Sequence, residues 1–204
     1  MGVMMYQRSM DKHRFNQMQA HWDRIPYANL KVGVLGLGEL GGHCAKTLSS
    51  LGFEVSGFSR TPKQIKGVQC FSGKDLKAFL TPLDVLINLL PVTPQTESML
   101  NKDFFKEMNE GTYLINVARG NHLVEEDLIS ALDEGKLSGA LLDVFRQEPL
   151  PADHPFWSHP KIKITPHVAS VTTPQSAIQL LLKNAERLVK GEELLHQVDR
   201  ESGY

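Results

Sequence analysis

Short runs of apolar residues alternate with amphipathic segments along most of this 204-residue chain. Runs that are apolar on both faces are typical of strands buried in a parallel sheet, whereas apolar residues that recur with helical spacing are typical of helices. The apolar runs predict strands at 31–36, 53–58, 68–71, 84–90, 112–118, 138–145 and 161–165. The amphipathic segments predict helices at 5–21, 39–51, 74–80, 101–108, 124–134 and 174–190.

This alternation, with its short connections, predicts an α/β fold: a doubly wound parallel sheet covered by helices on both faces. The length corresponds to one domain of about 150 residues with a remainder. We expect the sheet domain at 28–168, a helical segment before it at 1–27, and a helix and tail after it at 169–204.

Composition narrows the range of functions. Lys and Arg number 22 against 23 Asp and Glu, which disfavours nucleic-acid binding because such proteins usually carry a basic excess. No apolar stretch approaches the roughly 18 residues of a membrane-spanning helix, and the N-terminus lacks a secretory signal. Cys44 and Cys70 fit no metal motif, and we expect both to stay reduced in the cytoplasm.

A glycine-rich loop joins the first strand to the helix that follows it. Residues 36–41 read GLGELG, with glycines at Gly36, Gly38 and Gly41. Glycines at this spacing let the backbone turn sharply and approach a pyrophosphate, which then lies at the positive end of the helix. The motif predicts a dinucleotide site; a glycine turn without a ligand is the alternative.

The turn after the second strand indicates which dinucleotide binds. An NAD site usually places an acid there, yet no Asp or Glu occurs between Val55 and Lys74. Arg60 and Lys63 could instead hold a 2′-phosphate, and Ser59 and Thr61 could donate hydroxyl hydrogen bonds. We therefore expect NADP(H) to be preferred, with NAD(H) still possible. A solvated basic turn is the alternative.

Charged side chains follow three later strands, at the edge where such sheets bind ligands. Arg119 could clamp the carboxylate of a 2-oxo acid, and His167 could donate a proton to the forming alkoxide. Glu148 could orient His167, and Asp143 could accept a hydrogen bond from a nicotinamide carboxamide. Each has an ordinary alternative, such as a surface ion pair or a turn.

The other histidines suggest no chemistry. His43 is expected to pack inside the first helix of the sheet domain, and no spacing indicates a metal site. The remaining histidines are His13, His21, His122, His154, His159 and His196.

Several motifs together resemble one enzyme family. They are GLGELG at 36–41, LLPVTPQT at 89–96, INVARG at 115–120, LLDVFRQEPLP at 141–151 and ITPHVA at 164–169. The set resembles the D-isomer-specific 2-hydroxyacid dehydrogenases, and in particular their glyoxylate/hydroxypyruvate reductase group. The resemblance implies an NADPH-preferring reductase of small 2-oxo acids, with His167 as acid/base, Glu148 as its partner and Arg119 on the substrate carboxylate.

The resemblance also implies further cofactor contacts within these motifs, and none to a metal. Beyond the residues already given, the expected contacts are Leu37, Glu39, Leu40, Leu90, Pro91, Thr96, Val117 and Ala118, with Arg119 and His167 near the cofactor as well.

The N-terminal part departs from the family pattern. Family members begin with a substrate-domain segment of roughly a hundred residues, whereas about 27 residues precede the first strand here. Residues 1–27 resemble the helix that joins the two domains and packs across a dimer, so we expect a homodimer through this helix. A catalytically weak or inactive NADP-binding or oligomerisation module is the alternative, and a dehydrogenase-like corepressor is a weaker one.

Overall fold

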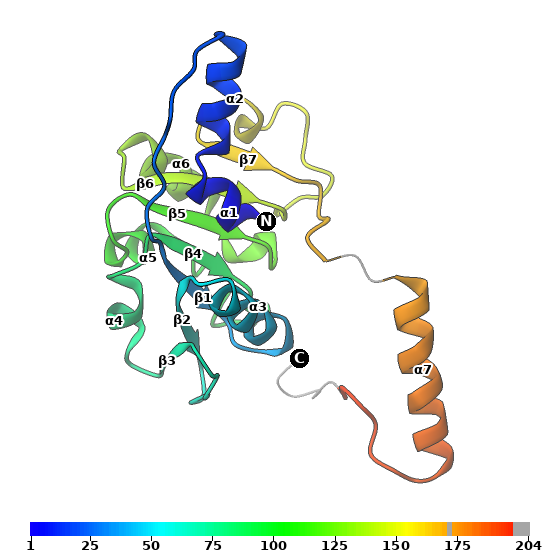
Figure 1. The fold of residues 1–204 in the computed structure, drawn as a ribbon. Helices are drawn as coiled ribbons and strands as arrows, with labels where there is room; N and C mark the ends of the chain where they lie inside the picture. Colours follow the sequence, from blue (N-terminus) through cyan, green and yellow to red (C-terminus); the bar gives the residue numbers. More distant parts are fainter. Residues whose placement is uncertain (171–172, 198–204) are drawn as a thin grey trace. The chain divides into compact units, whose positions relative to one another are not determined.

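The computed structural model describes residues 1–170 and 173–197 (Figure 1). It divides into two units, Met1–Pro166 and His167–Tyr204, each described by itself. The strands are β1 (Lys31–Leu35), β2 (Glu54–Ser59), β3 (Gln69–Ser72), β4 (Val85–Asn88), β5 (Thr112–Asn116), β6 (Leu137–Leu142) and β7 (Ile162–Ile164). The helices are α1 (Gly2–Gln7), α2 (Met10–Met18), α3 (Glu39–Ser50), α4 (Leu76–Leu80), α5 (Lys102–Glu107), α6 (Glu125–Asp133) and α7 (Pro174–Val189), with 3-10 turns at Gly120–His122 and Pro155–Trp157.

The first unit is built on one sheet with the strand order β3-β2-β1-β4-β5-β6-β7, and every neighbouring pair is parallel. The predicted doubly wound α/β fold is confirmed. The chain leaves β1 toward β2 on one side and returns to β4 on the other, which makes the gap between β1 and β4 the switch point of the topology. Ligands bind at the carboxyl ends of the strands beside such a point.

Both faces of the sheet are buried, which is why its central strands read as continuous apolar runs. In β4, Leu86 packs into one core cluster, whereas Val85 and Ile87 pack into the other. In β5, Leu114 joins the first cluster and Ile115 the second. Successive side chains therefore contact opposite layers of helices and loops.

The predicted single helix at 5–21 is wrong. The chain forms α1 and α2 with a break at Ser9, whose φ of 48° lies in the left-handed region. Val3 of α1 is buried in the core, and the Tyr6 ring stacks on Tyr113 of β5 with 4.2 Å between ring centroids. By contrast, α2 buries no residue, and Trp22, beyond its end, is 90% exposed.

The second unit contains α7, close to the predicted bounds of 174–190. Its apolar residues Ile178, Leu181, Leu182 and Leu188 are exposed. In the part of the chain that the structure describes, no helix has both the length and the apolarity needed to cross a membrane. Residues 171–172 and 198–204 lie outside this part.

Candidate cofactor and substrate site

The glycine loop between β1 and α3 is packed so tightly that only glycine fits at two of its positions. Gly36 has a φ of 101°, and a Cβ there would lie 2.8 Å from the backbone of Leu89. A Cβ on Gly41 would lie 1.7 Å from the carbonyl oxygen of Gly36. The loop thus folds back against its own helix, as a sharp strand-to-helix turn requires.

Gly38 differs from the other two glycines because the space beside it is open. A Cβ on Gly38 would meet nothing within 4 Å, and its φ of −70° is ordinary for any residue. Gly38 directly precedes α3, whose first turn presents backbone N–H groups and the positive end of the helix dipole. A glycine that nothing crowds is what a pyrophosphate needs in order to approach the backbone, so the loop fits a dinucleotide.

The other loop residues have different surroundings. Leu37 is buried against Gly57 of β2, where a Cβ would lie 2.5 Å from the Leu37 side chain. Glu39 and Leu40, in the first turn of α3, are exposed.

The basic turn after β2 holds both predicted cations at the surface. Arg60, Thr61 and Lys63 are exposed, whereas Ser59 is buried and its hydroxyl donates to the carbonyl oxygen of Thr61 at 2.7 Å. The hydroxyl hydrogen of Ser59 therefore stabilises the turn itself. In this geometry it is not directed at a 2′-phosphate, the partner expected for it.

A buried polar network that the sequence analysis missed joins the ends of β4 and β5. Asn88 and Asn116 are the last residues of the two strands and lie opposite each other in register. The amide of Asn88 donates to Asn116 Oδ1 at 3.0 Å and accepts from the N–H of Leu90 at 3.2 Å. Asn116 donates to the carbonyl oxygen of Arg119 at 3.2 Å and accepts from the N–H of Ala118 at 3.3 Å.

His122 completes this network and is fully buried. Its Nε2 lies 3.1 Å from the Pro91 carbonyl oxygen, and its Nδ1 lies 3.1 Å from both Asn88 Nδ2 and the Arg119 carbonyl oxygen. Burial lowers the pKa of His122. The sequence does contain a signal for this network. Each of two apolar strands ends in an asparagine, Asn88 and Asn116, and His122 follows in the loop after the second strand.

The loop after β4 is held by Thr96. The Thr96 hydroxyl donates to the Pro91 carbonyl oxygen at 2.7 Å and accepts from the N–H of Thr93 at 2.8 Å. Leu90 and Pro91 are half-buried beside it. Pro91 therefore receives hydrogen bonds from its own loop and from His122.

Arg119 follows β5 and its side chain is exposed at the edge of the sheet, next to the buried Ala118 and the half-buried Val117. Its Nη1 donates to the Ala118 carbonyl oxygen at 2.6 Å. The next residue, Gly120, touches the loop after β6 so closely that a Cβ would lie 1.9 Å from the carbonyl carbon of Phe145. The loops after β5 and β6 are thus in direct contact.

The loop after β6 carries two of the predicted site residues. Asp143 is buried, its carboxylate accepts a hydrogen bond from the Thr165 hydroxyl, and its N–H donates to the Asn116 carbonyl oxygen. Glu148 accepts from the N–H of Phe145 at 2.9 Å. Both carboxylates therefore organise their own loops, and their predicted contacts with the carboxamide and with His167 stay predictions.

Arg146, which the sequence analysis did not single out, ties this loop to its neighbours. It donates to the carbonyl oxygens of Leu123 and Asn121 and to the hydroxyl of Ser98, at 2.7, 3.2 and 2.6 Å.

His167 opens the second unit, is exposed, and has a φ of 54°. A left-handed conformation is uncommon outside glycine and is enriched at functional sites. Because Glu148 and Arg119 belong to the first unit, the pairing of these residues with His167 stays a prediction.

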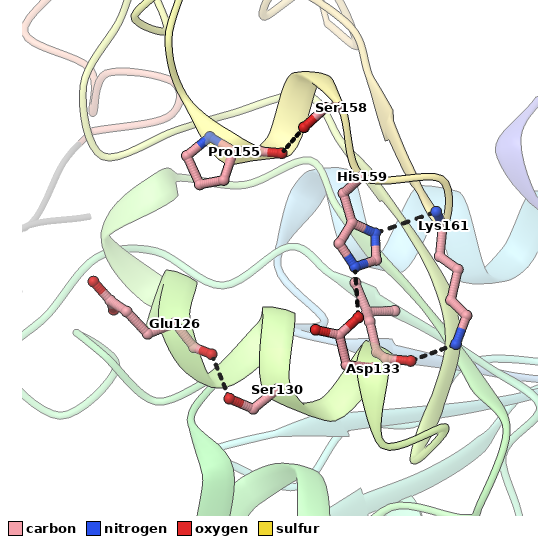
Figure 2. Close-up of polar contacts among 8 residues, drawn as sticks. Glu126, Ser130, Asp133, Pro155, Ser158, His159 and Lys161 are labelled. Carbon is pink, nitrogen blue, oxygen red and sulfur yellow. Dashed lines mark hydrogen bonds and ion pairs between the residues drawn. The ribbon is translucent and has the colours of Figure 1, made fainter.

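Two other histidines lie outside the network of His122. His43 is exposed on α3, so the expectation that it packs inside the fold is wrong. His159 directly precedes β7, at the end of the sheet where the strands begin, and it faces the last residue of α6, Asp133 (Figure 2). Its Nε2 lies 3.3 Å from Asp133 Oδ1, and its Nδ1 accepts from the N–H of Lys161 at 3.2 Å.

No group of three or more His, Cys, Asp or Glu residues within the described ranges could hold a metal ion.

Solved structures of similar proteins share this architecture. A D-isomer specific 2-hydroxyacid dehydrogenase family protein from Klebsiella pneumoniae 342 is 43% identical with a TM-score of 0.91, over 98% of this chain and 66% of that one. The D-isomer specific 2-hydroxyacid dehydrogenase from Xanthobacter autotrophicus Py2, solved with NADPH and MES, is 38% identical with a TM-score of 0.94, over 99% of this chain and 85% of that one. The NADPH-dependent glyoxylate/hydroxypyruvate reductase from Sinorhizobium meliloti, solved with NADP and sulfate, is 33% identical with a TM-score of 0.96, over 100% of this chain and 67% of that one.

This chain spans about two thirds of the length of the Klebsiella and Sinorhizobium proteins. Residues 1–169 match the family described as D-isomer specific 2-hydroxyacid dehydrogenase, NAD binding domain. The match covers the sheet, the glycine loop and the loops that carry Arg119 and Glu148. The chain therefore belongs to the D-isomer specific 2-hydroxyacid dehydrogenase family, as its motifs predicted.

Proposed function

We propose that this chain is the cofactor-binding part of an NADPH-dependent reductase of small 2-oxo acids, with glyoxylate and hydroxypyruvate as the expected substrates. The observation that carries the proposal is the glycine loop at the switch point of the sheet, where Gly36 and Gly41 are crowded and the space beside Gly38 is open. The exposed Arg60 and Lys63 after β2 favour NADP over NAD.

The proposed chemistry assigns one task to each residue. NADPH, when bound, supplies a hydride to the carbonyl carbon of the substrate. Arg119 holds the substrate carboxylate with its planar guanidinium. His167 gives a proton to the carbonyl oxygen, and Glu148 keeps the imidazole oriented and favours its charged form. The product is a D-2-hydroxy acid, in keeping with the family.

Gly38 provides a sharp test because its substitution separates binding from folding. In Gly38→Ala the new methyl group enters open space and meets an allowed φ, so the thermal midpoint should stay within about 2 °C of wild type. The same methyl group would block the approach of a pyrophosphate, and NADPH affinity should fall at least about tenfold. Fluorescence titration with NADPH measures this loss, and Gly42→Ala, within α3 and with ordinary space around it, is the control.

The preference for NADPH is tested at the basic turn. Arg60→Ala should weaken NADPH binding by about 1.5–3 kcal/mol, the usual value of a charge-assisted hydrogen bond, and leave NADH binding nearly unchanged. Arg14→Ala, which removes another exposed arginine from α2, is the matched control. Equal losses for the two cofactors would contradict the assignment of Arg60 to the 2′-phosphate.

The alternative is a catalytically weak or inactive NADP-binding and oligomerisation module. Oxidation of NADPH in the presence of glyoxylate decides between the two. Turnover of about 1 per second or faster would support the reductase, and NADPH binding without turnover would support the module.

A further inference from the structure

We propose that His122 is a positioning residue that locks the Pro91 loop to the end of β5 through a neutral imidazole with its proton on Nε2. The proposal deepens the proposed function and rests on it where cofactor affinity is concerned. His122 is fully buried, and it contacts both the loop that carries the expected cofactor residues Leu90, Pro91 and Thr96 and the main chain of Arg119.

The proton on His122 follows from its neighbours. The Pro91 carbonyl oxygen only accepts, so Nε2, 3.1 Å away, must donate. The two amide hydrogens of Asn88 point at Asn116 Oδ1 and at His122 Nδ1, and the orientation of that amide is set because its oxygen accepts from the N–H of Leu90. Nδ1 therefore faces a donor and must accept.

In this protonation state each donor and acceptor of the network has a hydrogen-bond partner, and the contact between Nδ1 and the Arg119 carbonyl oxygen is not itself a hydrogen bond. The Arg119 carbonyl oxygen, also 3.1 Å from Nδ1, has its own donor in the Asn116 amide. A second proton on the imidazole would lie on Nδ1 and clash with the Asn88 amide hydrogen that points at this nitrogen. Burial lowers the pKa of His122, which acts in the same direction.

The consequence concerns the cofactor loop. The Pro91 carbonyl oxygen accepts from Thr96 within its own loop and from His122 outside it. Thr96 therefore shapes the loop, whereas the His122 bond connects it to the edge of the sheet beside Arg119. Without that bond the loop keeps its shape and its later main-chain ties, from Ser98 to Asn121 and from Leu100 to His122, but Pro91 loses its own link to this edge.

Two conservative variants divide the roles of the two ring nitrogens. In His122→Gln the side-chain amide nitrogen can take the place of Nε2 and donate to Pro91. In His122→Asn the side-chain oxygen can take the place of Nδ1 and accept from Asn88, but nothing reaches Pro91. NADPH titration should show an affinity loss of about tenfold for the Asn variant, equal to about one net hydrogen bond, and of about twofold or less for the Gln variant.

A purely structural role predicts a different result. Each variant removes one hydrogen bond from the same buried site, so the two should be destabilised alike in thermal unfolding. Equal NADPH affinities for the Gln and Asn variants would overturn the proposal. His159→Asn is the matched control, because it keeps the Nδ1 contact with Lys161 and removes the Nε2 contact with Asp133 at the opposite edge. It should lower stability without changing NADPH affinity.

The tautomer is tested without any ligand. A long-range proton–nitrogen NMR spectrum of the wild-type chain at neutral pH should show His122 neutral with the proton on Nε2. A proton on Nδ1, alone or together with one on Nε2, would overturn the proposal. If the wild-type chain does not bind NADPH, the proposed function fails while this spectrum still decides the protonation of His122.

Discussion

His122 illustrates how one buried side chain can organise a binding edge that it does not itself enter. Its Nε2 donates to the Pro91 loop after β4 and its Nδ1 accepts from Asn88 at the end of β4, while His122 itself lies in the turn after β5. Buried polar groups of this kind are costly when unpaired, so they hold a single arrangement of the loops around them.

The lowered pKa of His122 makes stability depend on pH. Burial lowers this pKa most, two backbone carbonyls raise it, and Arg119 lowers it. Unfolding returns it to about 6.5, so below that pH the unfolded chain binds the proton first and stability falls by up to about 1.4 kcal/mol per pH unit, until the pKa of the folded state is reached. Above the unfolded pKa this contribution is complete.

Urea unfolding at pH of about 7.5 and about 5.5 measures this effect as the difference between wild type and His122→Gln. The Gln variant lacks the titrating group, so its stability should decline less on acidification. All other groups are the same in the two proteins, so their contributions cancel in the comparison. A decline of the same size in both would show that the folded state of His122 binds its proton normally.

Individual site residues could be predicted from the sequence where their type is conspicuous. Arg119 and Glu148 stand out as charges that follow apolar strands, and the structure places both on loops at the predicted edge. His122 and Asn88 were missed because their partners are main-chain carbonyls and other amides, which leave no charge pattern. The hydrogen bond that the Ser59 hydroxyl donates could not be predicted for the same reason, since its acceptor is a backbone oxygen two residues away.

Strands and helices were predictable wherever burial on both faces produced unbroken apolar runs. The main errors lie at ends and breaks. The run at 84–90 continues through Leu89 and Leu90, yet β4 ends at Asn88, which binds the N–H of Leu90 with its side chain. The opening helix was expected to be continuous because the spacing of apolar residues does not reveal tertiary contacts. Tyr6 packs on the sheet, whereas α2, after Ser9, buries no residue.

The two opening helices should differ in what they contribute to stability. Val3 of α1 is 4% exposed, and truncation in Val3→Ala should cost about 2 kcal/mol through lost burial and a small cavity. Met18 of α2 is exposed, and Met18→Ala should change the free energy of unfolding by less than about 0.5 kcal/mol. Chemical unfolding of the two variants, at a concentration where the chain is monomeric, is the measurement. A large loss in Met18→Ala would mean that α2 packs on something in solution.

Large apolar side chains lie at the surface near the N-terminus. Met10, Met18 and Trp22 are exposed near the N-terminus, and Met5 is half-buried. Clusters of this kind usually mark interaction sites. We therefore predict that the purified chain self-associates through this segment, as a homodimer.

Analytical ultracentrifugation at micromolar concentration tests this association. The double variant Met18→Glu with Trp22→Glu should shift the chain toward the monomer, because charges would be buried at the contact. Leu51→Glu, at an exposed apolar residue after α3, is the control and should leave the distribution unchanged. A wild-type chain that sediments as a clean monomer would contradict the prediction.

The contact at Gly120 has a consequence for recombining this chain with its relatives. The backbone after β5 lies so close to Phe145 that each loop occupies the space left by the other. A chimaera with a crossover between these two positions would unite loops that were shaped by different partners, even if each parent folds well. Residues 117–148 must therefore be inherited as one block, and substrate preference is better altered by exchanging the whole block than by grafting either loop alone.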